Sequence, residues 1–188
     1  MTIALQHVHS GKVRDIYSAG DDRLLMVTSD RMSAFDVVMA EPIPHKGRVL
    51  TAMSAFWFEA LGDVVGSHLL STDVADLPDG VTDGTDDLVG RIMLCRRAEM
   101  LPIECIVRGY LSGSAWKEYR SSGTMPGVEL PPDLQESDQL PEPVFTPSTK
   151  AESGHDENIS YDAAVDLVGE EIAGKARDAS LELYRRGA

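Results

Sequence analysis

Residues 100–119, MLPIECIVRGYLSGSAWKEY, decide how the second half of the chain folds. The apolar run at residues 101–107 predicts a strand, which is interrupted by the single carboxylate of Glu104. After a turn rich in glycine and serine, residues 115–120 predict a helix with Ser114 as its N-cap. A strand, a turn and a helix are therefore expected in direct succession.

A cation stands where this strand meets the turn. Arg108 ends the apolar run, residues 109–111 are expected to be flexible, and Gly123 is expected to end the helix. The N–H groups and the dipole of the helix start, together with a planar guanidinium, favour an anion such as phosphate. The alternative is an ordinary strand–loop–helix junction without a ligand. Glu104 favours a site, because a carboxylate within an apolar strand needs a metal ion or a cation as its partner.

The composition is that of a soluble globular protein with one large domain or two small ones. The 188 residues are 43% hydrophobic and 26% charged. We find neither a run of membrane-spanning length nor the pattern of a signal peptide. The net charge of −14 argues against binding to nucleic acid or to an anionic membrane. We expect a cytoplasmic protein in which Cys95 and Cys105 are reduced core residues.

A second cationic segment lies near the N-terminus, at residues 11–17. Within a strand, Lys12 and Arg14 would point to the same face and would suit nucleotide phosphates, although the spacing is not that of a Walker loop. A solvated edge hairpin is the alternative. The apolar run at residues 24–28 predicts a buried strand, which a turn at residues 21–22 would join to the first one as a β-hairpin.

A dense polar cluster follows that buried strand at residues 29–36. Loops at strand ends carry chemistry more often than core positions do, but a turn whose serine and aspartate side chains bind their own backbone is the alternative. Apolar and aromatic residues then recur at helical spacing over residues 49–61, and we expect this stripe to pack in the core. Residues 88–97 predict another strand.

The last third of the chain contains a proline-rich segment, a polar loop and a helix. Residues 124–147 hold six of the ten prolines, which predicts an extended surface segment rather than a helix or a strand. Residues 146–158 combine a lysine, carboxylates and an amide, which suit magnesium and phosphate, although a hydrophilic loop before a helix is the alternative. Ser160 is expected to cap one last helix, whose apolar residues recur over residues 165–183.

Taken together, these motifs resemble those of the SAICAR synthetase family, the purine-pathway ligases also called phosphoribosylaminoimidazole-succinocarboxamide synthases. The run Leu101-Pro102-Ile103-Glu104, followed by Val107-Arg108 and by Gly113-Ser114, matches a family signature. GKVR at residues 11–14 matches the family's ATP motif GK-x-[KR], and SAFD at residues 33–36 matches its motif for the imidazole nucleotide. The resemblance covers essentially all 188 residues.

The resemblance implies a two-lobed α+β fold, similar to ATP-grasp and kinase-like architectures, with ATP in the cleft between the lobes. Residues 1–98 would form a nucleotide-binding lobe with an antiparallel sheet, and residues 99–188 would form part of a second, mixed α/β lobe. Family members continue to a D-x-K-x-E-F-G strand that this sequence does not contain. The resemblance therefore implies a truncated, cleaved or incompletely represented polypeptide. Its catalysis would be severely impaired if nothing supplies the missing part, although the phosphate and nucleotide half-sites could survive.

The implied reaction joins carboxyaminoimidazole ribonucleotide (CAIR) to L-aspartate in purine biosynthesis. It would consume ATP with Mg²⁺ and give SAICAR, ADP and phosphate through an acyl phosphate. A small-molecule kinase with the same cleft and a catalytically impaired nucleotide-binding fragment stay open as alternatives. The expected partners are small molecules, not nucleic acid or a membrane.

The resemblance also assigns roles to individual residues. The nucleotide contacts would be Lys12, Arg14, Ala98, Met100, Leu101 and Lys150. The substrate contacts would be Ser33, Asp36, Arg108, Ser114 and Asp156, with Arg108 and Ser114 at the 5′-phosphate of the ribonucleotide. The metal ligands would be Glu104 and Asp156, and the catalytic residues would be Asp36, Glu104 and Lys150. Glu152 completes the family's spacing of a lysine and two acids.

Overall fold

The chain folds into two compact units, Met1–Glu99 and Met100–Ala188, each of which is described by itself. The structure is a computed structural model, and it describes residues 2–34, 37–79, 81–83, 85–150 and 156–188. Helices and antiparallel strands occur in both units, which confirms the α+β class. In the part of the chain that the structure describes, no helix combines the length and the apolar character needed to cross a membrane.

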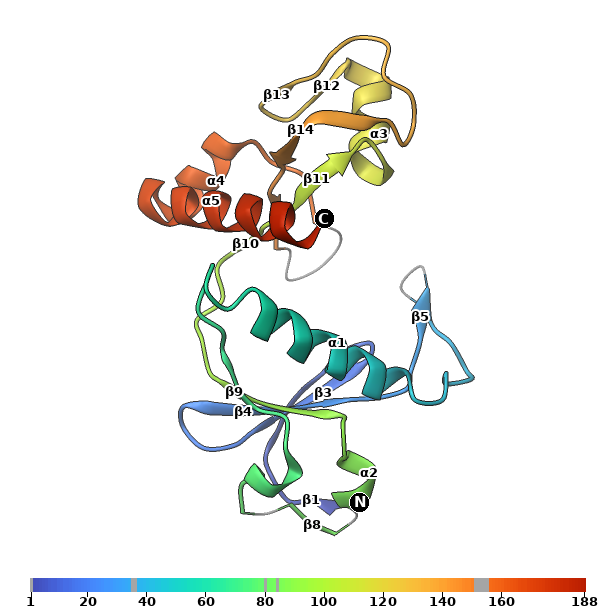
Figure 1. The fold of residues 1–188 in the computed structure, drawn as a ribbon, viewed down its shortest axis with the longest axis vertical. Helices are drawn as coiled ribbons and strands as arrows, with labels where there is room; N and C mark the ends of the chain where they lie inside the picture. Colours follow the sequence, from blue (N-terminus) through green and yellow to red (C-terminus); the bar gives the residue numbers. More distant parts are fainter. Residues whose placement is uncertain (1, 35–36, 80, 84, 151–155) are drawn as a thin grey trace. The chain divides into compact units, whose positions relative to one another are not determined.

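A five-stranded antiparallel sheet forms the centre of the first unit (Figure 1). Its strands, in spatial order, are β2 (His7–Ser10), β3 (Arg14–Ser18), β4 (Arg23–Thr28), β9 (Ile92–Arg96) and β7 (Leu69–Ser71). The pairing of β3 with β4 confirms the predicted hairpin. Lys12 precedes β3 instead of lying within it, so the predicted strand face shared with Arg14 is wrong.

One face of this sheet carries the core of the first unit. Strand alternation places Leu25 and Val27 of β4 on that face, where they pack with Leu94 of β9. The face is covered by short elements (Figure 1), namely β1 (Thr2–Ile3), η1 (Val74–Asp76), β8 (Val81–Asp83) and α2 (Thr85–Leu88). The predicted strand at residues 88–97 is wrong at its start, because Leu88 ends α2 and Gly90, with a φ of 72°, turns the chain before β9.

Helix α1 (Lys46–Ala60) covers the opposite face of the sheet (Figure 1). The hydroxyl of Thr51 donates a hydrogen bond to that of Thr28 at 3.3 Å, and both residues are buried. The buried residues of α1, Gly47 and Thr51, are thus small, and many of its large apolar residues are exposed. The predicted core stripe is therefore wrong in this structure, since Phe56 is 60% exposed and Trp57 is 41% exposed. The hairpin of β5 (Ser33–Ala34) and β6 (Val37–Val38) precedes this helix.

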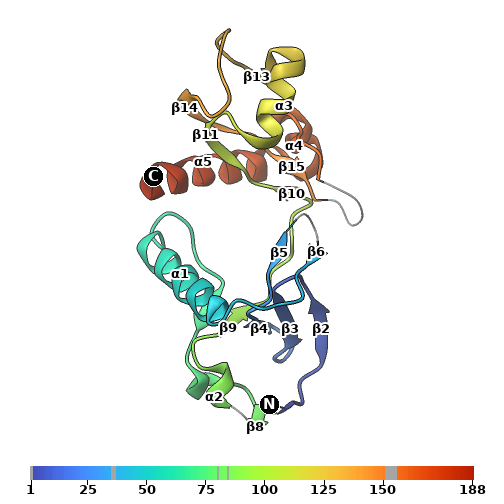
Figure 2. The same ribbon diagram turned by 90° about the vertical axis from the view of Figure 1, so that its right-hand side faces the viewer.

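Short antiparallel pairs of strands build the second unit (Figure 2). They pair β10 (Ile103–Glu104) with β15 (Ser148–Thr149), β11 (Val107–Tyr110) with β14 (Gln139–Phe145), and β12 (Thr124–Met125) with β13 (Val128–Glu129). The single strand predicted at residues 101–107 is thus split in two, and Gly109 belongs to β11 and not to a flexible turn.

The proline-rich segment forms strands, so its prediction as a strand-free surface segment is wrong. Pro141 and Pro143 lie within β14, between the residues that pair with β11 at Gln139 and Val144. The register shifts in this interval, and β14 has β11 as its strand neighbour in the described sheet. A residue without an N–H group is tolerated on such an edge strand, because the missing donor would not face another strand.

Three helices of the second unit are α3 (Gly113–Ser122), α4 (Tyr161–Val168) and α5 (Glu170–Gly187). Gly123, with a φ of 73°, ends α3 as predicted, but its N-cap is Ser112 and not Ser114. Ser160 caps α4 as predicted, with its hydroxyl accepting a hydrogen bond from the N–H of Ala163 at 3.2 Å. The single last helix is wrong, because Gly169, with a φ of 84°, separates α4 from α5.

Helix α5 packs against β11 and β14 (Figure 2), and a compact core forms where α3 meets the strands. This core contains Leu111, Ala115, Tyr119, Met125 and Leu140. The two cysteines are free thiols, as expected. Cys95 is buried, and burial raises the pKa of its thiol to about 11. Cys105 is exposed, so its prediction as a core residue is wrong.

Candidate active site

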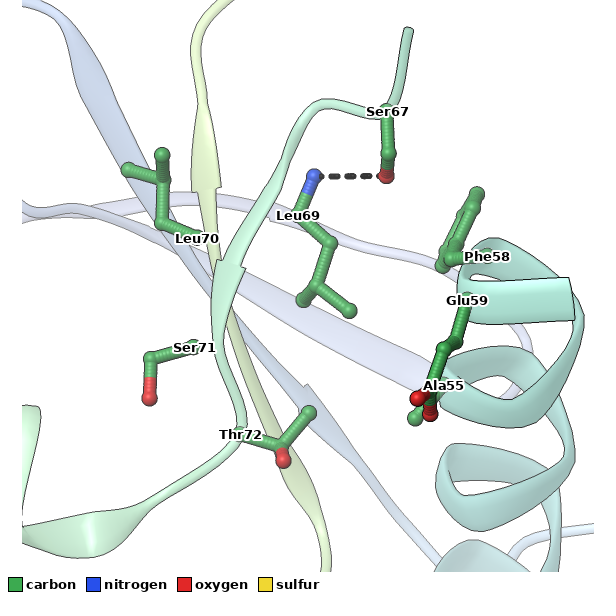
Figure 3. Close-up of a pocket in the computed structure, with 8 residues that line it drawn as sticks. All are labelled: Ala55, Phe58, Glu59, Ser67, Leu69, Leu70, Ser71 and Thr72. Atoms are coloured by element: carbon green, nitrogen blue, oxygen red, sulfur yellow. Dashed lines mark hydrogen bonds between the residues drawn. The ribbon is translucent and has the colours of Figure 1, made fainter. Parts of the chain in front are cut away.

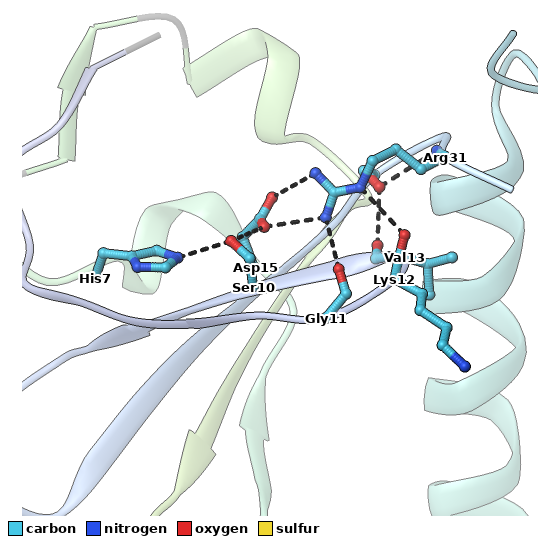
Figure 4. Close-up of polar contacts among 8 residues, drawn as sticks. His7, Ser10, Gly11, Lys12, Val13, Asp15 and Arg31 are labelled. Atoms are coloured by element: carbon cyan, nitrogen blue, oxygen red, sulfur yellow. Dashed lines mark hydrogen bonds and ion pairs between the residues drawn. The ribbon is translucent and has the colours of Figure 1, made fainter. Parts of the chain in front are cut away.

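In the first unit, Arg31 holds the turn that joins β2 to β3 (Figure 4). Its Nε donates to the carbonyl of Lys12 at 3.2 Å, and its Nη2 donates to the carbonyl of Gly11 at 3.2 Å. The backbone N–H and the hydroxyl of Ser29 both donate to the carbonyl of Val13 at 2.9 Å. Three consecutive carbonyls of the predicted phosphate-binding turn are therefore bound by the segment that follows β4.

Asp15 holds Arg31 in place through a forked ion pair. The Nη1–Oδ2 distance is 3.1 Å and the Nη2–Oδ1 distance is 3.0 Å. The Ser10 hydroxyl donates to Asp15 Oδ1 at 2.8 Å, and the Ser10 Oγ lies 2.9 Å from Nε2 of His7. Burial alone would raise the pKa of Asp15, but the hydrogen bonds from Arg31 and Ser10 lower it overall. The carboxylate therefore stays ionised and keeps the guanidinium oriented.

The two predicted phosphate-binding cations lie at this turn. The side chain of Lys12 points away from the Arg31 guanidinium (Figure 4). Arg14 is the first residue of β3, and its buried Nε has no hydrogen-bond partner in the part of the chain that the structure describes. A buried donor without a partner costs free energy, so this nitrogen suits an added acceptor such as a phosphate oxygen.

Asp30 joins the end of β4 to the start of α1, a connection that sequence reasoning missed. Its carboxylate accepts hydrogen bonds from the backbone N–H of His45 at 3.1 Å and of Gly47 at 2.9 Å. Both of its oxygens also bind the guanidinium of Arg91, with 2.8 Å between Oδ2 and Nη2. These contacts, the Arg91 hydrogen bond first among them, hold the pKa of Asp30 well below its usual range. The segment between Asp30 and the start of α1 contains Ser33, which is half-buried in β5.

In the second unit, Arg108 of β11 links α3 to Thr146, the residue that follows β14. Its Nε donates to the Oγ1 of Thr146 at 3.1 Å, and its Nη2 donates to the Oγ of Ser114 at 2.9 Å. Thr146 is buried, whereas Ser114 is exposed in the first turn of α3. Ser112, the N-cap, does not bind the helix start with its side chain. The structure thus brings Arg108 and Ser114 together at an exposed helix N-terminus, an arrangement that favours an anion.

Glu104 and Lys150 form an ion pair on the other strand pair of the second unit. The distance from Lys150 Nζ to Glu104 Oε1 is 3.3 Å, and both side chains are about half-exposed. The backbone N–H of Lys150 donates to the carbonyl of Pro102 at 3.1 Å, which anchors the lysine beside β10. The cation that the Glu104 carboxylate needs is therefore present within the chain.

Asp156 precedes Glu157, which pairs with the residue before Lys150. The backbone N–H of Thr149 donates to the carbonyl of Glu157 at 2.9 Å, so the neighbours Lys150 and Asp156 flank the segment at residues 151–155. That segment, with Glu152, lies outside the described residues, as does Asp36.

Glu104 fits magnesium held jointly with a phosphate. Magnesium uses one or two protein carboxylates and completes its shell with water and phosphate oxygens. Glu104 offers one half-exposed carboxylate, and Asp156 offers a second one on the adjoining segment. Among the described residues, no group of three or more histidines, cysteines and acids could hold a metal by itself. The donor set therefore suits a metal that arrives with its nucleotide.

The three predicted adenine contacts lie next to the boundary between the two units. Ala98 belongs to the end of the first unit, and Met100 and Leu101 begin the second. All three are exposed, and Met100 has 71% of its surface accessible.

A pocket of about 350 Å³ lies between α1 and β7 in the first unit (Figure 3). Phe58 and Glu59 line it from the helix, and Leu69 and Thr72 line it from the strand side. None of the described site residues that the sequence predicts lines this pocket. It therefore adds nothing to the candidate site.

Comparison with known proteins supports the resemblance to SAICAR synthetases that the sequence motifs indicate. The phosphoribosylaminoimidazole-succinocarboxamide synthase of Syntrophotalea carbinolica is 60% identical over 183 residues, which are 97% of this chain and 62% of that protein. A solved SAICAR synthase from Saccharomyces cerevisiae, complexed with SAICAR, is 42% identical with a TM-score of 0.88, and the match covers 97% of this chain and 62% of that one.

A more distant structure, a type-2 SAICAR synthetase in complex with ADP, shares the fold with a TM-score of 0.71 at 23% identity. That match covers 95% of this chain and 66% of the other. The chain thus spans about 62% of the length of the first of these relatives. The sequence profile of SAICAR synthetase matches residues 7–188. The chain therefore belongs to the SAICAR synthetase family.

Proposed function

We propose that this protein provides the nucleotide-binding and ribonucleotide-binding residues of an ATP-dependent ligase that joins CAIR to L-aspartate. The observation that carries the proposal is the contact of Arg108 with Ser114 at the start of α3, within a chain of this family. The yeast relative in complex with SAICAR supports the same substrate class. The products would be SAICAR, ADP and inorganic phosphate, and the reaction belongs to cytoplasmic purine biosynthesis.

The Arg108 cluster would anchor the 5′-phosphate of the ribonucleotide. The guanidinium is fixed from two sides, by Thr146 and by Ser114, so little side-chain entropy is lost when a phosphate binds. The N–H groups of the first turn of α3 add donors and the positive end of the helix dipole. Binding energy at this remote phosphate would orient the reacting carboxylate. Ser33 and Asp36 would hold the imidazole part of the same substrate.

Three cations would bind the nucleotide phosphates. Lys12 and Arg14 stand at the turn between β2 and β3, and Lys150 stands beside β10. The ion pair with Glu104 places a cation and an oxygen ligand 3.3 Å apart, which suits a phosphate and its metal ion. Glu104 and Asp156 would hold Mg²⁺, which neutralises phosphate charge when bound. The backbone at Ala98, Met100 and Leu101 would lie against the adenine.

The chemistry needs an activated carboxylate, because a free carboxylate is a poor electrophile. An oxygen of the CAIR carboxylate attacks the γ-phosphorus of ATP, the bond to the β-phosphate oxygen breaks, and ADP leaves. The amine of L-aspartate then attacks the carbonyl carbon of the acyl phosphate, inorganic phosphate leaves, and the amine nitrogen loses its extra proton. Cations at the phosphates stabilise the charge that develops in both steps. No side chain needs to form a covalent bond with the substrate.

The test is ADP release with ATP, Mg²⁺ and CAIR, measured with and without L-aspartate. The proposal predicts release that depends on aspartate, together with SAICAR as a product identified by its mass. A small-molecule kinase would release ADP with CAIR alone and leave a stable phosphorylated product. A nucleotide-binding module without ligase activity would show no aspartate-dependent turnover. The kinase outcome would overturn the proposal. Failure of the protein to bind ATP or CAIR would overturn it too, because a chain that spans 62% of its relative can keep the binding residues without turnover.

The acyl phosphate is tested separately with CAIR labelled by ¹⁸O in its carboxylate. Because the carboxylate oxygen becomes the bridge to phosphorus and leaves with it, one label per turnover should appear in inorganic phosphate. Unlabelled phosphate would exclude the acyl phosphate route while leaving the overall ligation intact.

A further inference from the structure

We propose that Arg31 is a positioning residue that shapes the turn at Gly11–Val13 for the phosphates of the nucleotide. This inference rests on the proposed function, since it assigns a new role within the same nucleotide site. It begins with how Arg31 uses its donors. Four hydrogen bonds, to Gly11, Lys12 and both oxygens of Asp15, occupy four of the five N–H groups of the guanidinium. Arg31 is therefore committed to the protein and is not itself a phosphate ligand.

The direction of the turn's carbonyls determines the direction of its N–H groups. In a trans peptide the C=O of one residue and the N–H of the next are antiparallel, and the described residues contain no cis peptide bond. Arg31 binds the carbonyls of Gly11 and Lys12, and Ser29 binds that of Val13. The N–H groups of Lys12 and Val13 are consequently directed away from Arg31, and the N–H group of Arg14 is directed away from Ser29. Successive N–H groups on one side of a turn form a concavity that suits an anion.

The side chains at the turn complement this backbone arrangement. Lys12 points away from Arg31, on the side opposite the bound carbonyls (Figure 4). The buried Nε of Arg14 has no hydrogen-bond partner among the described residues. Backbone donors and two cations thus belong to one turn, whose conformation is set by contacts from a segment that lies 16 to 20 positions later in the sequence.

The charge of the positioning group is balanced locally. Asp15 pairs with Arg31 through both oxygens, and Ser10 donates to the same carboxylate. The pair holds the backbone without leaving an unpaired charge beside the phosphates. Lysine in place of arginine would keep the charge, but its single nitrogen cannot form the same fork with Asp15 and also reach two carbonyls.

The experiment measures the dissociation constants of ADP with Mg²⁺ and of adenosine for wild type, Arg31→Lys, Asp15→Asn and the double variant. Arg23→Lys is the matched control, because Arg23 lies in the same unit in a loose surface pair with Asp22 at 3.7 Å. Adenosine lacks phosphates, so it reports on the rest of the site. A general loss of folding would weaken both ligands, whereas a misshaped phosphate turn weakens ADP alone.

We expect Arg31→Lys and Asp15→Asn each to weaken ADP binding by about ten-fold or more, with adenosine binding unchanged. The double variant should be no weaker than the worse single variant, because the two residues act as one unit. If Arg31→Lys binds ADP with the wild-type dissociation constant, the positioning role alone is wrong. The same holds if the variants bind ADP and adenosine equally more weakly than wild type does. Wild-type protein that does not bind ADP would overturn the nucleotide part of the proposed function, and the positioning role with it.

Discussion

Asp30 shows at the scale of a single residue how the first unit places its polar segments. One carboxylate binds two backbone N–H groups at the start of α1 and a guanidinium from the turn before β9. Arg91 lies 61 positions away in the sequence, so no local pattern reveals the pair. Because the segment that contains Ser33 runs between β4 and α1, this clamp fixes both of its ends.

Replacing Asp30 by asparagine should change how stability depends on pH. The folded-state pKa of Asp30 is lowered, so its charge contributes stability above the unfolded pKa of about 4 and loses that contribution as pH falls towards the folded value. Asp30→Asn should cost about 3 kcal/mol at neutral pH, since it leaves Arg91 without its charged partner. Urea unfolding at neutral pH and below about pH 4 should show that acidification lowers the free energy of unfolding less for Asp30→Asn than for wild type.

The matched control for this change is Asp22→Asn. The Asp22 side chain is 84% exposed in its pair with Arg23, so its removal should alter neither stability nor the acid dependence. If acidification lowers the free energy of unfolding equally in wild type and Asp30→Asn, the assigned role of Asp30 is wrong.

Gly47 is required by a close approach of backbone to backbone. A Cβ atom there would lie 2.6 Å from the carbonyl oxygen of Thr28 and 2.9 Å from that of Ser29. Neither oxygen can move without shifting β4, so Gly47→Ala should destabilise the protein by about 1–3 kcal/mol despite the better helix propensity of alanine. The measurement is the midpoint of urea unfolding. Gly66→Ala, where a Cβ meets nothing within 4 Å, should have no such effect, and equal midpoints for the two variants would refute the argument.

At the scale of elements, two helices of the second unit have serine at the N-cap position but differ in the contacts of their first turns. Ser160 binds the N–H of Ala163 at the start of α4, as its position in the sequence predicts. Ser112 starts α3 without a side-chain cap, and Ser114 turns to Arg108 instead. The helix start that lacks a side-chain cap is the one placed beside a cation. This difference follows if the start of α3 is kept for a ligand.

Removal of the two caps should therefore have unequal effects on stability. Ser160→Ala should cost about 1 kcal/mol, because an N–H group of α4 loses its acceptor, and Ser160→Asp should restore the loss. Ser112→Ala is the comparison, and it should cost much less in the absence of ligand. Thermal unfolding of the three variants measures the differences. An equal loss for Ser112→Ala and Ser160→Ala would show that α3 is capped in solution.

Sequence patterns predicted elements well where the determining contacts are local. The hairpin of β3 and β4, the stop at Gly123 and the cap at Ser160 all depend on neighbours within a few positions. The patterns failed where distant contacts decide. The strand β14 forms despite two prolines because β11 offers it a partner. The exposed stripe of α1 follows helical periodicity, but periodicity does not show which face the sheet covers.

At the scale of the whole molecule, the candidate site residues form small polar clusters, each within one unit, in a strongly acidic chain. The net charge of −14 opposes phosphorylated ligands, so local cations must offset it. The sequence motifs identified the cations and acids, and the structure joins Arg108 with Ser114 and Glu104 with Lys150. Motifs could not reveal the residues that position them, such as Arg31, because those contacts depend on the folded backbone.

The most direct test of this account is the affinity for SAICAR and for its riboside, which lacks the 5′-phosphate, measured by calorimetry on wild type and Arg108→Lys. Arg120→Lys, an exposed position near the other end of α3, is the control. We predict that wild type and the control prefer SAICAR over the riboside, and that Arg108→Lys loses about ten- to a hundred-fold in affinity for SAICAR alone. If Arg108→Lys binds SAICAR as wild type does, the phosphate is held elsewhere and the central claim is wrong.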